Sequence, residues 1–429
     1  MLEDRLYLIS RVFEGSSEEE SNWHYPAYHF HESLNTKKRV LEEGLAKVEE
    51  ERGTRKKPLR QPISRKSGDM NQPLDNSDDH TSNESYNNPN ILSRLPGDLI
   101  MTCFLHLSRS DYGAIASVNR TFRSMIQDLY KHRRQQGIME HWIYFSCTAL
   151  QWQAFDPYSR RWIKVPQMPA SLTETFTFSD KESLAVGTDL LVFGREMTSS
   201  VVLRYSILSN SWSPGVVMNS PRCLFGSASL GGKAIIAGGI TNNGEILNSA
   251  ELYDSETRTW EVLPPMNRAR KMCSGVFMDG KFYVIGGMAN EREVLTCGEQ
   301  YDMKQGSWQL IPNMSAGLSG EHGAPPLVAV VDNVLYAARY ADNIVMKYNK
   351  ENNAWKRLGK LPERSDSMNG WGIAFRACGE RLIVIGRRGP RGGMVELNSC
   401  VPNAGKPEWK TIAVMQSADF VFNCAVMGC

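Results

Sequence analysis

The feature that most constrains this chain is a tryptophan that recurs about every 48 residues through its last two thirds. Its copies are Trp162, Trp212, Trp260, Trp308, Trp355 and Trp409, at spacings of 50, 48, 48, 47 and 54 residues. An aromatic residue stands seven positions before each of the first five: Phe155, Tyr205, Tyr253, Tyr301 and Tyr348. Such a period indicates six copies of one supersecondary unit that must pack against their neighbours.

Each repeat has the pattern of a β-hairpin. The residues directly after the aromatics are Asp156, Ser206, Asp254, Asp302 and Asn349. Side chains of these types cap a turn by accepting hydrogen bonds from nearby backbone amides, and the Trp then begins the next strand. Short apolar runs at 234–237 and 282–285 predict an upstream strand, and a glycine pair follows each, which permits positive φ and close backbone approach.

Three repeats depart from this pattern. Gly194-Arg195, Ala337-Ala338 and Gly386-Arg387 stand where the glycine pair is expected, and we assign Leu397 the place of the sixth tyrosine. The spacing of the tryptophans still supports a strand pair in each of the three.

Repeats of this length with Gly-Gly, then Tyr, then Trp resemble kelch motifs. The resemblance implies that residues 141–429 form a six-bladed, mainly β propeller of four-stranded blades. Its structural residues here are Gly238, Gly239, Tyr253, Trp260, Gly286, Gly287, Tyr301, Trp308, Tyr348 and Trp355.

Closure of the ring follows from counting strands. Runs at 142–145, 152–155 and 162–165 supply three strands of the first blade, and the run at 420–427 has no blade of its own. We expect this last strand to lie innermost in the first blade, because that placement leaves neither end of the ring with a free edge.

Residues 91–137 have a helical pattern. Leu95, Leu99, Cys103 and Leu107 recur every four residues and form one stripe, and a second stripe begins at Tyr112. Pro96 is tolerated at a helix start. Some 40 residues are too few to bury all these apolar groups, which is typical of a docking module.

The pattern Leu95-Pro96-x-Asp98-Leu99 and the stripes after it resemble an F-box, with Phe122 and Gly97 where that family usually has Trp and an acid. The resemblance implies docking on the Skp-type adaptor of a cullin–RING ubiquitin ligase. An ordinary helical cap on the next domain is the alternative. The adaptor-binding candidates are Leu95, Pro96, Leu99, Cys103, Phe104, Leu107, Tyr112, Ile115, Val118 and Phe122.

The first 90 residues are expected to be largely disordered, because their charges form blocks among Ser, Asn, Pro and Gly. Arg52 to Lys66 holds seven basic residues and no acid. The basic groups at 37–39 and 55–57 fit either a split nuclear-import signal or a solvated basic linker. We expect the protein in the nucleus, the cytoplasm or both.

Several classes of function are disfavoured. A net charge of +2 argues against a dedicated nucleic-acid or membrane binder, and no apolar run is long enough to cross a bilayer or act as a secretory signal. Nine scattered cysteines without a Cys-x-x-Cys pair indicate reduced, mostly buried thiols rather than zinc ligands. Copper oxidases share this kind of propeller, but the repeats hold only His141 and His322. We expect no metal, no cofactor and no catalytic residue.

Arginines precede the innermost strand of several repeats. Arg222 and Arg270 are one repeat apart, and Arg364 has a comparable place. Two interpretations are open: these side chains line a rim that binds carboxylates or phosphates of a substrate, or they cap carbonyls of the neighbouring blade.

A helical F-box-like module joined to a kelch propeller resembles the plant F-box/kelch-repeat family. The resemblance implies a non-catalytic substrate receptor, in which the helices bind the ligase adaptor and the propeller binds an unidentified protein. The receptor would raise the local concentration of that protein near the ligase. A kelch scaffold unconnected with ubiquitin is the alternative.

Overall fold

The computed structural model describes residues 96–148, 150–169, 182–196, 199–318, 324–363, 370–388, 393–402, 405–417 and 420–428. The segment predicted to be disordered, together with Leu95, His322 and Arg364, lies outside the described residues.

The helical module contains three α-helices: α3 (Gly97–Leu105), α4 (Tyr112–Val118) and α5 (Arg120–Gln135), with a 3-10 turn at Arg109–Asp111. The second predicted stripe is therefore carried by two helices. Asn119 separates them because its backbone is extended and its side chain caps α5 by accepting a hydrogen bond from the Phe122 amide at 2.8 Å.

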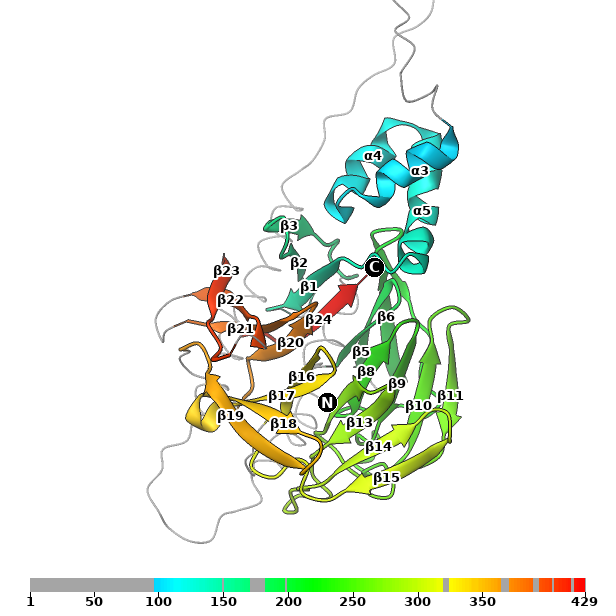
Figure 1. The fold of residues 1–429 in the computed structure, drawn as a ribbon. Coiled ribbons are helices and arrows are strands. Elements are labelled where there is room, and N and C mark those ends of the chain that lie inside the picture. Colours follow the sequence, from blue (N-terminus) through cyan, green and yellow to red (C-terminus); the bar gives the residue numbers. More distant parts are fainter. Residues whose placement is uncertain are drawn as a thin grey trace, which may run out of the picture. The chain divides into compact units, whose positions relative to one another are not determined.

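Six four-stranded antiparallel sheets follow, which confirms the predicted six-bladed propeller (Figure 1). Blade 1 is β24 (Asn423–Gly428), β1 (His141–Ser146), β2 (Trp152–Asp156) and β3 (Arg161–Lys164). Blade 2 is β4 (Ser183–Val186), β5 (Asp189–Glu196), β6 (Ser199–Ser206) and β7 (Ser211–Pro214). Blade 3 is β8 (Gly226–Leu230), β9 (Lys233–Ala237), β10 (Ala250–Asp254) and β11 (Thr259–Leu263).

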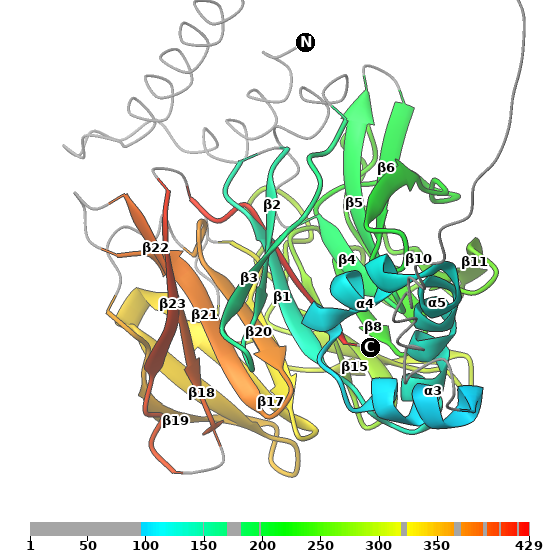
Figure 2. The ribbon, with the colours of Figure 1, turned by 90° about the horizontal axis from the view of Figure 1, so that it is seen from above.

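Blade 4 is β12 (Ser274–Met278), β13 (Lys281–Ile285), β14 (Gly298–Asp302) and β15 (Ser307–Ile311). Blade 5 is β16 (Leu327–Val331), β17 (Val334–Arg339), β18 (Ile344–Asn349) and β19 (Ala354–Lys360), with a 3-10 turn at Tyr340–Asp342. Blade 6 is β20 (Ala374–Cys378), β21 (Arg381–Arg387), β22 (Met394–Cys400) and β23 (Lys410–Gln416). Each blade is given from its innermost strand outward, and the six innermost strands contact one another around the ring (Figure 2).

The ring is closed by pairing the end of the chain with the start of the propeller. β24 pairs antiparallel with β1, from Gly428 opposite His141 to Asn423 opposite Ser146. Blade 1 thus takes its innermost strand from the C-terminal residues and its other three from the start of the repeats. Neither the first nor the last blade is left with an open inner edge.

In blades 2 to 5 the tyrosine and tryptophan of the repeat face each other across the outer hairpin. Tyr253 is the register partner of Trp260, with ring centroids 4.8 Å apart, and Tyr301 and Trp308 repeat the arrangement at 5.0 Å. Asp254 caps the intervening turn by accepting a hydrogen bond from the Glu256 amide at 2.8 Å. These aromatic pairs bury large apolar surfaces in the outer half of these blades.

The strand pairing in blade 6 shows that Leu397 does not take the place of the sixth tyrosine. Leu397 pairs with Ile385, whereas Cys400 pairs with Leu382, the position that corresponds to the partner of Tyr253 in blade 3. Cys400, not Leu397, therefore occupies the place of the sixth tyrosine. The connection from Cys400 to Trp409 is two residues longer than the seven-residue spacing of the other repeats.

Neighbouring blades are linked by the indole groups. The Trp260 Nε1 donates to the Val216 carbonyl at 3.0 Å, and the Trp308 Nε1 donates to the Pro264 carbonyl at 2.7 Å. The corresponding indoles of blades 2, 5 and 6 bond to carbonyls 41 to 49 residues upstream. The recurring Trp thus packs within its own blade and also holds the chain that leaves the previous one.

The two faces of the ring differ in the connections that they carry. Because strands alternate in direction, the third-to-fourth strand turns of every blade and the first-to-second strand turns of blades 2 to 6 lie on one face, which we call the turn face. The second-to-third strand loops and the connections between blades lie on the other, which we call the loop face. The helical module contacts the turn face: Asp111 pairs with Arg161 at the start of β3, and Ile207, after β6, packs against the module's core.

Candidate functional site

Apolar side chains are exposed on the helical module. Leu99 is 48% exposed, Leu107 is 38% exposed and Val118 is 57% exposed. Pro96 and Cys103 are also exposed, and Ile115 is partly exposed. Leu99 and Cys103 lie one turn apart on α3, and Leu107 follows two residues after the helix ends, so the predicted stripe continues beyond the helix.

Three of the predicted adaptor-binding residues belong to the module's own core instead. Phe104, Tyr112 and Phe122 are buried. The Phe104 and Phe122 rings meet edge to face with centroids 5.2 Å apart, and Tyr112 meets Tyr130 in the same way at 5.5 Å. As an adaptor-binding candidate Phe104 is therefore not accessible in this structure, because α3 and α5 need large side chains between them to pack.

One buried carboxylate joins the module to the propeller. Glu140, directly before β1, accepts hydrogen bonds from the Ser108 hydroxyl at 2.9 Å and the Arg109 amide at 3.0 Å. It also accepts from the Arg133 guanidinium at 3.1 Å and from the Trp142 indole at 2.9 Å. Burial opposes its ionisation, but these hydrogen bonds and the Arg133 charge hold the pKa of Glu140 below its usual value.

The Arg109 side chain adds a second link across this junction. Its guanidinium lies 3.8 Å from the centroid of the Trp142 ring and donates to the Tyr144 hydroxyl at 2.9 Å. Burial raises the pKa of Tyr205, which stacks near Tyr144, to about 12, so its hydroxyl stays neutral. Module and propeller are thus held by a buried network of hydrogen bonds rather than by a flexible tether. The charged residues of this network had no repeating pattern by which the sequence could have revealed them.

The prediction of an exposed arginine rim is wrong for Arg222. Its side chain is 0% exposed. It donates to the Gly238 and Ser249 carbonyls, at 3.2 and 2.8 Å, and to the Glu251 carboxylate at 2.8 Å. All three acceptors belong to blade 3 itself, so the alternative of a cap on the neighbouring blade is also inaccurate.

Arg270 repeats the arrangement one blade later. It donates to the Gly286 carbonyl at 2.9 Å and to the Glu299 carboxylate at 2.6 Å, and both charged side chains are 0% exposed. Neither arginine can reach a protein partner. The third candidate, Arg364, lies outside the described residues.

Each carboxylate of these clusters also receives an asparagine. Glu251 accepts from the backbone and side-chain nitrogens of Asn219, and Glu299 accepts in the same way from Asn267. We call each Asn–Arg–Glu set a blade clamp. The sequence did contain a signal for these clamps. Asn-x-x-Arg occurs at 219–222 and again at 267–270, and a Glu stands two positions before Tyr253 and before Tyr301.

The described residues offer no sign of redox or metal chemistry. No group of three or more His, Cys, Asp and Glu side chains among them could hold a metal ion, and no described helix is long and apolar enough to cross a membrane. Burial raises the pKa of Cys273 and Cys424 to about 11 and that of Cys378 and Cys400 to about 12. These thiols are protonated and unreactive at neutral pH.

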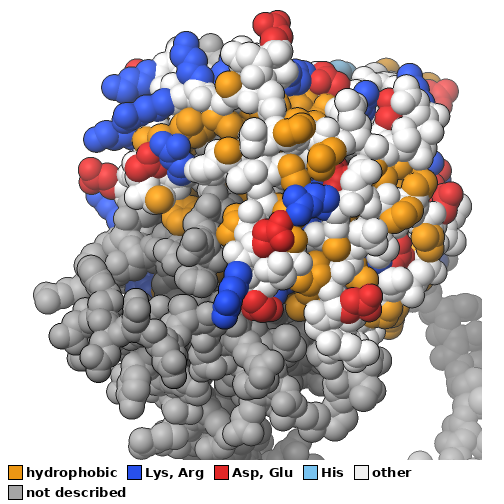
Figure 3. Space-filling view, turned by 90° about the horizontal axis from the view of Figure 1, so that it is seen from below, with side chains coloured by type: hydrophobic (Ala, Val, Ile, Leu, Met, Phe, Trp, Pro, Cys, Tyr) orange, Lys and Arg blue, Asp and Glu red, His pale blue; other side chains and the backbone are white. Residues whose placement is uncertain are grey.

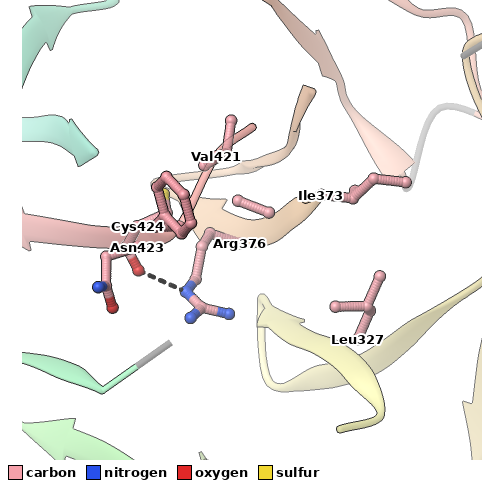
Figure 4. Close-up of a pocket in the computed structure, with 8 residues that line it drawn as sticks. Leu327, Ile373, Arg376, Val421, Asn423 and Cys424 are labelled. Carbon is pink, nitrogen blue, oxygen red and sulfur yellow. Dashed lines mark hydrogen bonds between the residues drawn. The ribbon is translucent and has the colours of Figure 1, made fainter. Parts of the chain in front are cut away.

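The loop face carries a recess at the mouth of the central channel. Leu327, Ile373, Val421 and Cys424 line it where β16, β20 and β24 begin, together with the half-buried Arg376 (Figure 4). Arg376 Nε donates to the Cys424 carbonyl at 3.0 Å. Figure 3 shows apolar side chains in separate groups on the face seen from below, with charges of both signs between them.

Two family models match this chain. The model described as FKB95, Kelch-repeats domain matches residues 160–400, and the F-box domain model matches residues 92–134.

Curated relatives cover both parts. The chain is 50% identical over 461 residues to F-box/kelch-repeat protein At1g74510 of Arabidopsis thaliana, with 100% of both chains covered. It is 51% identical to F-box/kelch-repeat protein SKIP11 of the same plant, covering 81% of this chain and 77% of the relative. It is 53% identical to F-box/kelch-repeat protein At1g26930, covering 83% and 87%.

Proposed function

Because the chain belongs to the F-box/kelch-repeat family, we propose that it is the substrate-recognition subunit of an SCF-type ubiquitin ligase. The helical module binds the Skp-type adaptor, and through it the cullin–RING ligase. The propeller binds a target protein, which the assembled ligase marks for degradation. The receptor contributes binding and position, and the bond-forming chemistry is done elsewhere in the complex.

The exposed stripe on the module carries this proposal. Leu99 and Leu107 remain in solvent although the module has a buried core of its own. A leucine that is buried by a partner contributes about 1.5–3 kcal/mol, so two of them provide much of the free energy of a stable docking contact. Exposed apolar side chains also occur on the described propeller, such as Val262 on β11 and the consecutive Val216 and Val217.

The buried junction supports the second half of the proposal. The module contacts the turn face, so a partner on its stripe leaves the loop face open to a substrate. The Glu140 and Arg109 contacts hold the two parts in one arrangement. A substrate bound to the propeller would then be held at a defined position relative to the ligase, which raises its effective concentration there.

The test is adaptor binding by the full-length chain. Leu99→Glu/Leu107→Glu places two charges in the stripe, and we expect the affinity for a purified Skp-type adaptor to fall at least about 100-fold. Val262→Glu, at a 63% exposed position of β11, is the matched control and should bind as the wild type does. Thermal unfolding of both variants should be unchanged because all three positions are exposed.

Undiminished binding by the double variant contradicts the assignment of the docking surface. A wild-type chain that binds no Skp-type adaptor favours the kelch scaffold. Cys103 provides a second readout, because it is exposed between Leu99 and Leu107. Adaptor should slow its alkylation by iodoacetamide about tenfold or more, and Cys103→Ser identifies the labelled peptide.

We also propose that the protein acts in the nucleus, the cytoplasm or both. The support is the pair of basic groups at 37–39 and 55–57. Alanine in place of Lys37, Lys38 and Arg39 should reduce nuclear accumulation of a fluorescent fusion if the segment is an import signal. An unchanged distribution favours a solvated linker.

A further inference from the structure

The six innermost strands, all of them described by the structure, carry positive charge only. The six innermost strands have the sequences SLAV, GSASL, SGVFM, LVAVV, AFRAC and NCAVMG. Arg376 is the one ionisable side chain among them apart from cysteine. It therefore stands alone in an otherwise apolar and weakly polar wall.

Arg376 differs from the structural arginines in what it binds. Arg222 and Arg270 each have a buried carboxylate within 2.8 Å. Arg376 Nε and Nη1 donate instead to the Cys424 and Phe375 carbonyls, at 3.0 and 3.1 Å, and no carboxylate pairs with it among the described residues. A half-buried guanidinium without a counter-ion has lost part of its hydration and gains from an anion.

The surroundings of Arg376 define what kind of anion fits. Figure 4 shows its terminal nitrogens directed away from Val421 and Ile373. Ile373 lines the same recess and is partly exposed, whereas Leu327 and Val421 are buried behind it. A ligand with a carboxylate next to an apolar group matches both parts of this recess.

A second cation lies near the same mouth. The guanidinium of Arg387, at the end of β21, is 5.2 Å from the centroid of the Phe420 ring, and Phe420 immediately precedes Val421. Its buried Nε has no hydrogen-bond partner among the described residues. Two positive charges at one mouth attract an acidic segment over a longer range than one charge alone.

We propose that this recess, on the loop face, binds an acidic side chain of the substrate protein. An Asp or Glu of an extended segment pairs with Arg376, and an adjacent apolar residue of that segment packs on the partly exposed Ile373. This inference rests on the proposed function, since it assigns the substrate contact of the same receptor. The recess is remote from the adaptor stripe, so both partners can bind at once.

The test uses random 12-residue peptides displayed on phage and selected on the full-length chain. We expect selected peptides to be enriched in Asp or Glu beside an apolar residue. A synthetic peptide of the selected sequence is then titrated against wild type and Arg376→Gln. We expect about tenfold weaker binding for the variant, and about the same loss when the peptide acid is replaced by its amide in the wild type.

Combining Arg376→Gln with the amide peptide shows whether Arg376 pairs directly with the peptide acid. The amide peptide should bind wild type and Arg376→Gln equally, because the ion pair is already absent. Arg381→Gln is the matched control: it removes an exposed charge from the turn face of the same blade and should leave binding unchanged. Ile373→Glu, which supplies an internal acid at a partly exposed position, should block the acidic peptide and gives a readout independent of the Arg376 contact with β24.

Selected peptides without acidic enrichment, or a selection that yields no enriched peptide, would overturn the proposal. So would additive effects of the two changes, or an equal loss with Arg381→Gln. None of these measurements involves the adaptor, so failure here is distinguishable from failure of the ligase assignment.

Discussion

Blades 3 and 4 and blade 5 have the same four-stranded sheet, but they organise the connection between their second and third strands differently. In blades 3 and 4 a glycine pair turns the chain, and a buried Arg–Glu pair holds the carbonyls beside it. In blade 5 the strand continues through Ala337 and Ala338 into a short 3-10 turn, which ends with Asn343 at positive φ.

The difference extends to the position of the clamp carboxylate. Glu251 stands two residues before Tyr253, and Met346 has the same place relative to Tyr348 in blade 5. Met346 is buried in an apolar cluster. The glycine pair, the arginine and the glutamate therefore occur together or not at all in these three blades. We conclude that they form one structural unit rather than separate features of the repeat.

The largest effect should come from breaking one clamp. Arg270→Ala leaves Glu299 buried without its cation, and we expect a loss of about 3–5 kcal/mol in the free energy of unfolding. The control is Arg268→Ala in the same connection, whose ion pair with Glu293 is about half exposed on both sides and should matter by less than about 1 kcal/mol. Denaturant unfolding measures both. Equal losses would show that the buried pair is not the stabilising element.

The next effect concerns the glycine pair. Gly239 has φ of +96°, and a Cβ added there would lie 2.5 Å from the Cys223 carbonyl oxygen. We expect Gly239→Ala to cost about 2–3 kcal/mol through backbone strain and this clash. Ala337→Gly in blade 5 removes a side chain from a regular strand and should cost about 0.5–1 kcal/mol. If the two changes cost the same, the glycine pair is not required by the turn.

A smaller loss of stability is expected when the charged pair of a clamp is replaced by apolar side chains. Arg270→Met/Glu299→Met makes blade 4 resemble blade 5, and we expect a loss of about 1–2 kcal/mol, less than that of Arg270→Ala. The remaining cost arises because the Asn267 and Arg268 amides lose their acceptor. Denaturant unfolding of the single and double variants gives the comparison. A double variant less stable than Arg270→Ala would contradict the idea.

The smallest effect compares the outer turns of blades 3 and 4. Arg258 has φ of +58°, and Gly306 has the same place two residues before its tryptophan with φ of +64°. Arg258→Gly should stabilise the protein by about 0.5–1 kcal/mol, because an exposed non-glycine residue is disfavoured in the left-handed region. Gly306→Ala should destabilise by a similar amount. Melting temperatures of the two variants should shift in opposite directions.

Much of the propeller could be derived from the sequence because its repeat is local. Tyr253, Asp254 and Trp260 lie within one hairpin, so their spacing alone fixes a turn and a register. The closing strand could be derived as well, since a ring of four-stranded blades left one strand over. The helical stripes predicted a docking module, although they did not separate exposed Leu99 from buried Phe104.

Burial of charge was decided by the tertiary structure. Arg222 and Glu251 are 29 residues apart, and a repeat pattern does not report whether such side chains meet inside the protein or point into solvent. The same holds for Glu140, whose partners come from the residue before the 3-10 turn, from α5 and from β1. It holds too for Arg376, which is distinctive because the other five inner strands bring no charge to the channel. Local spacing determines hairpins and stripes, whereas the free energy of a buried charge depends on every group that the whole chain places around it.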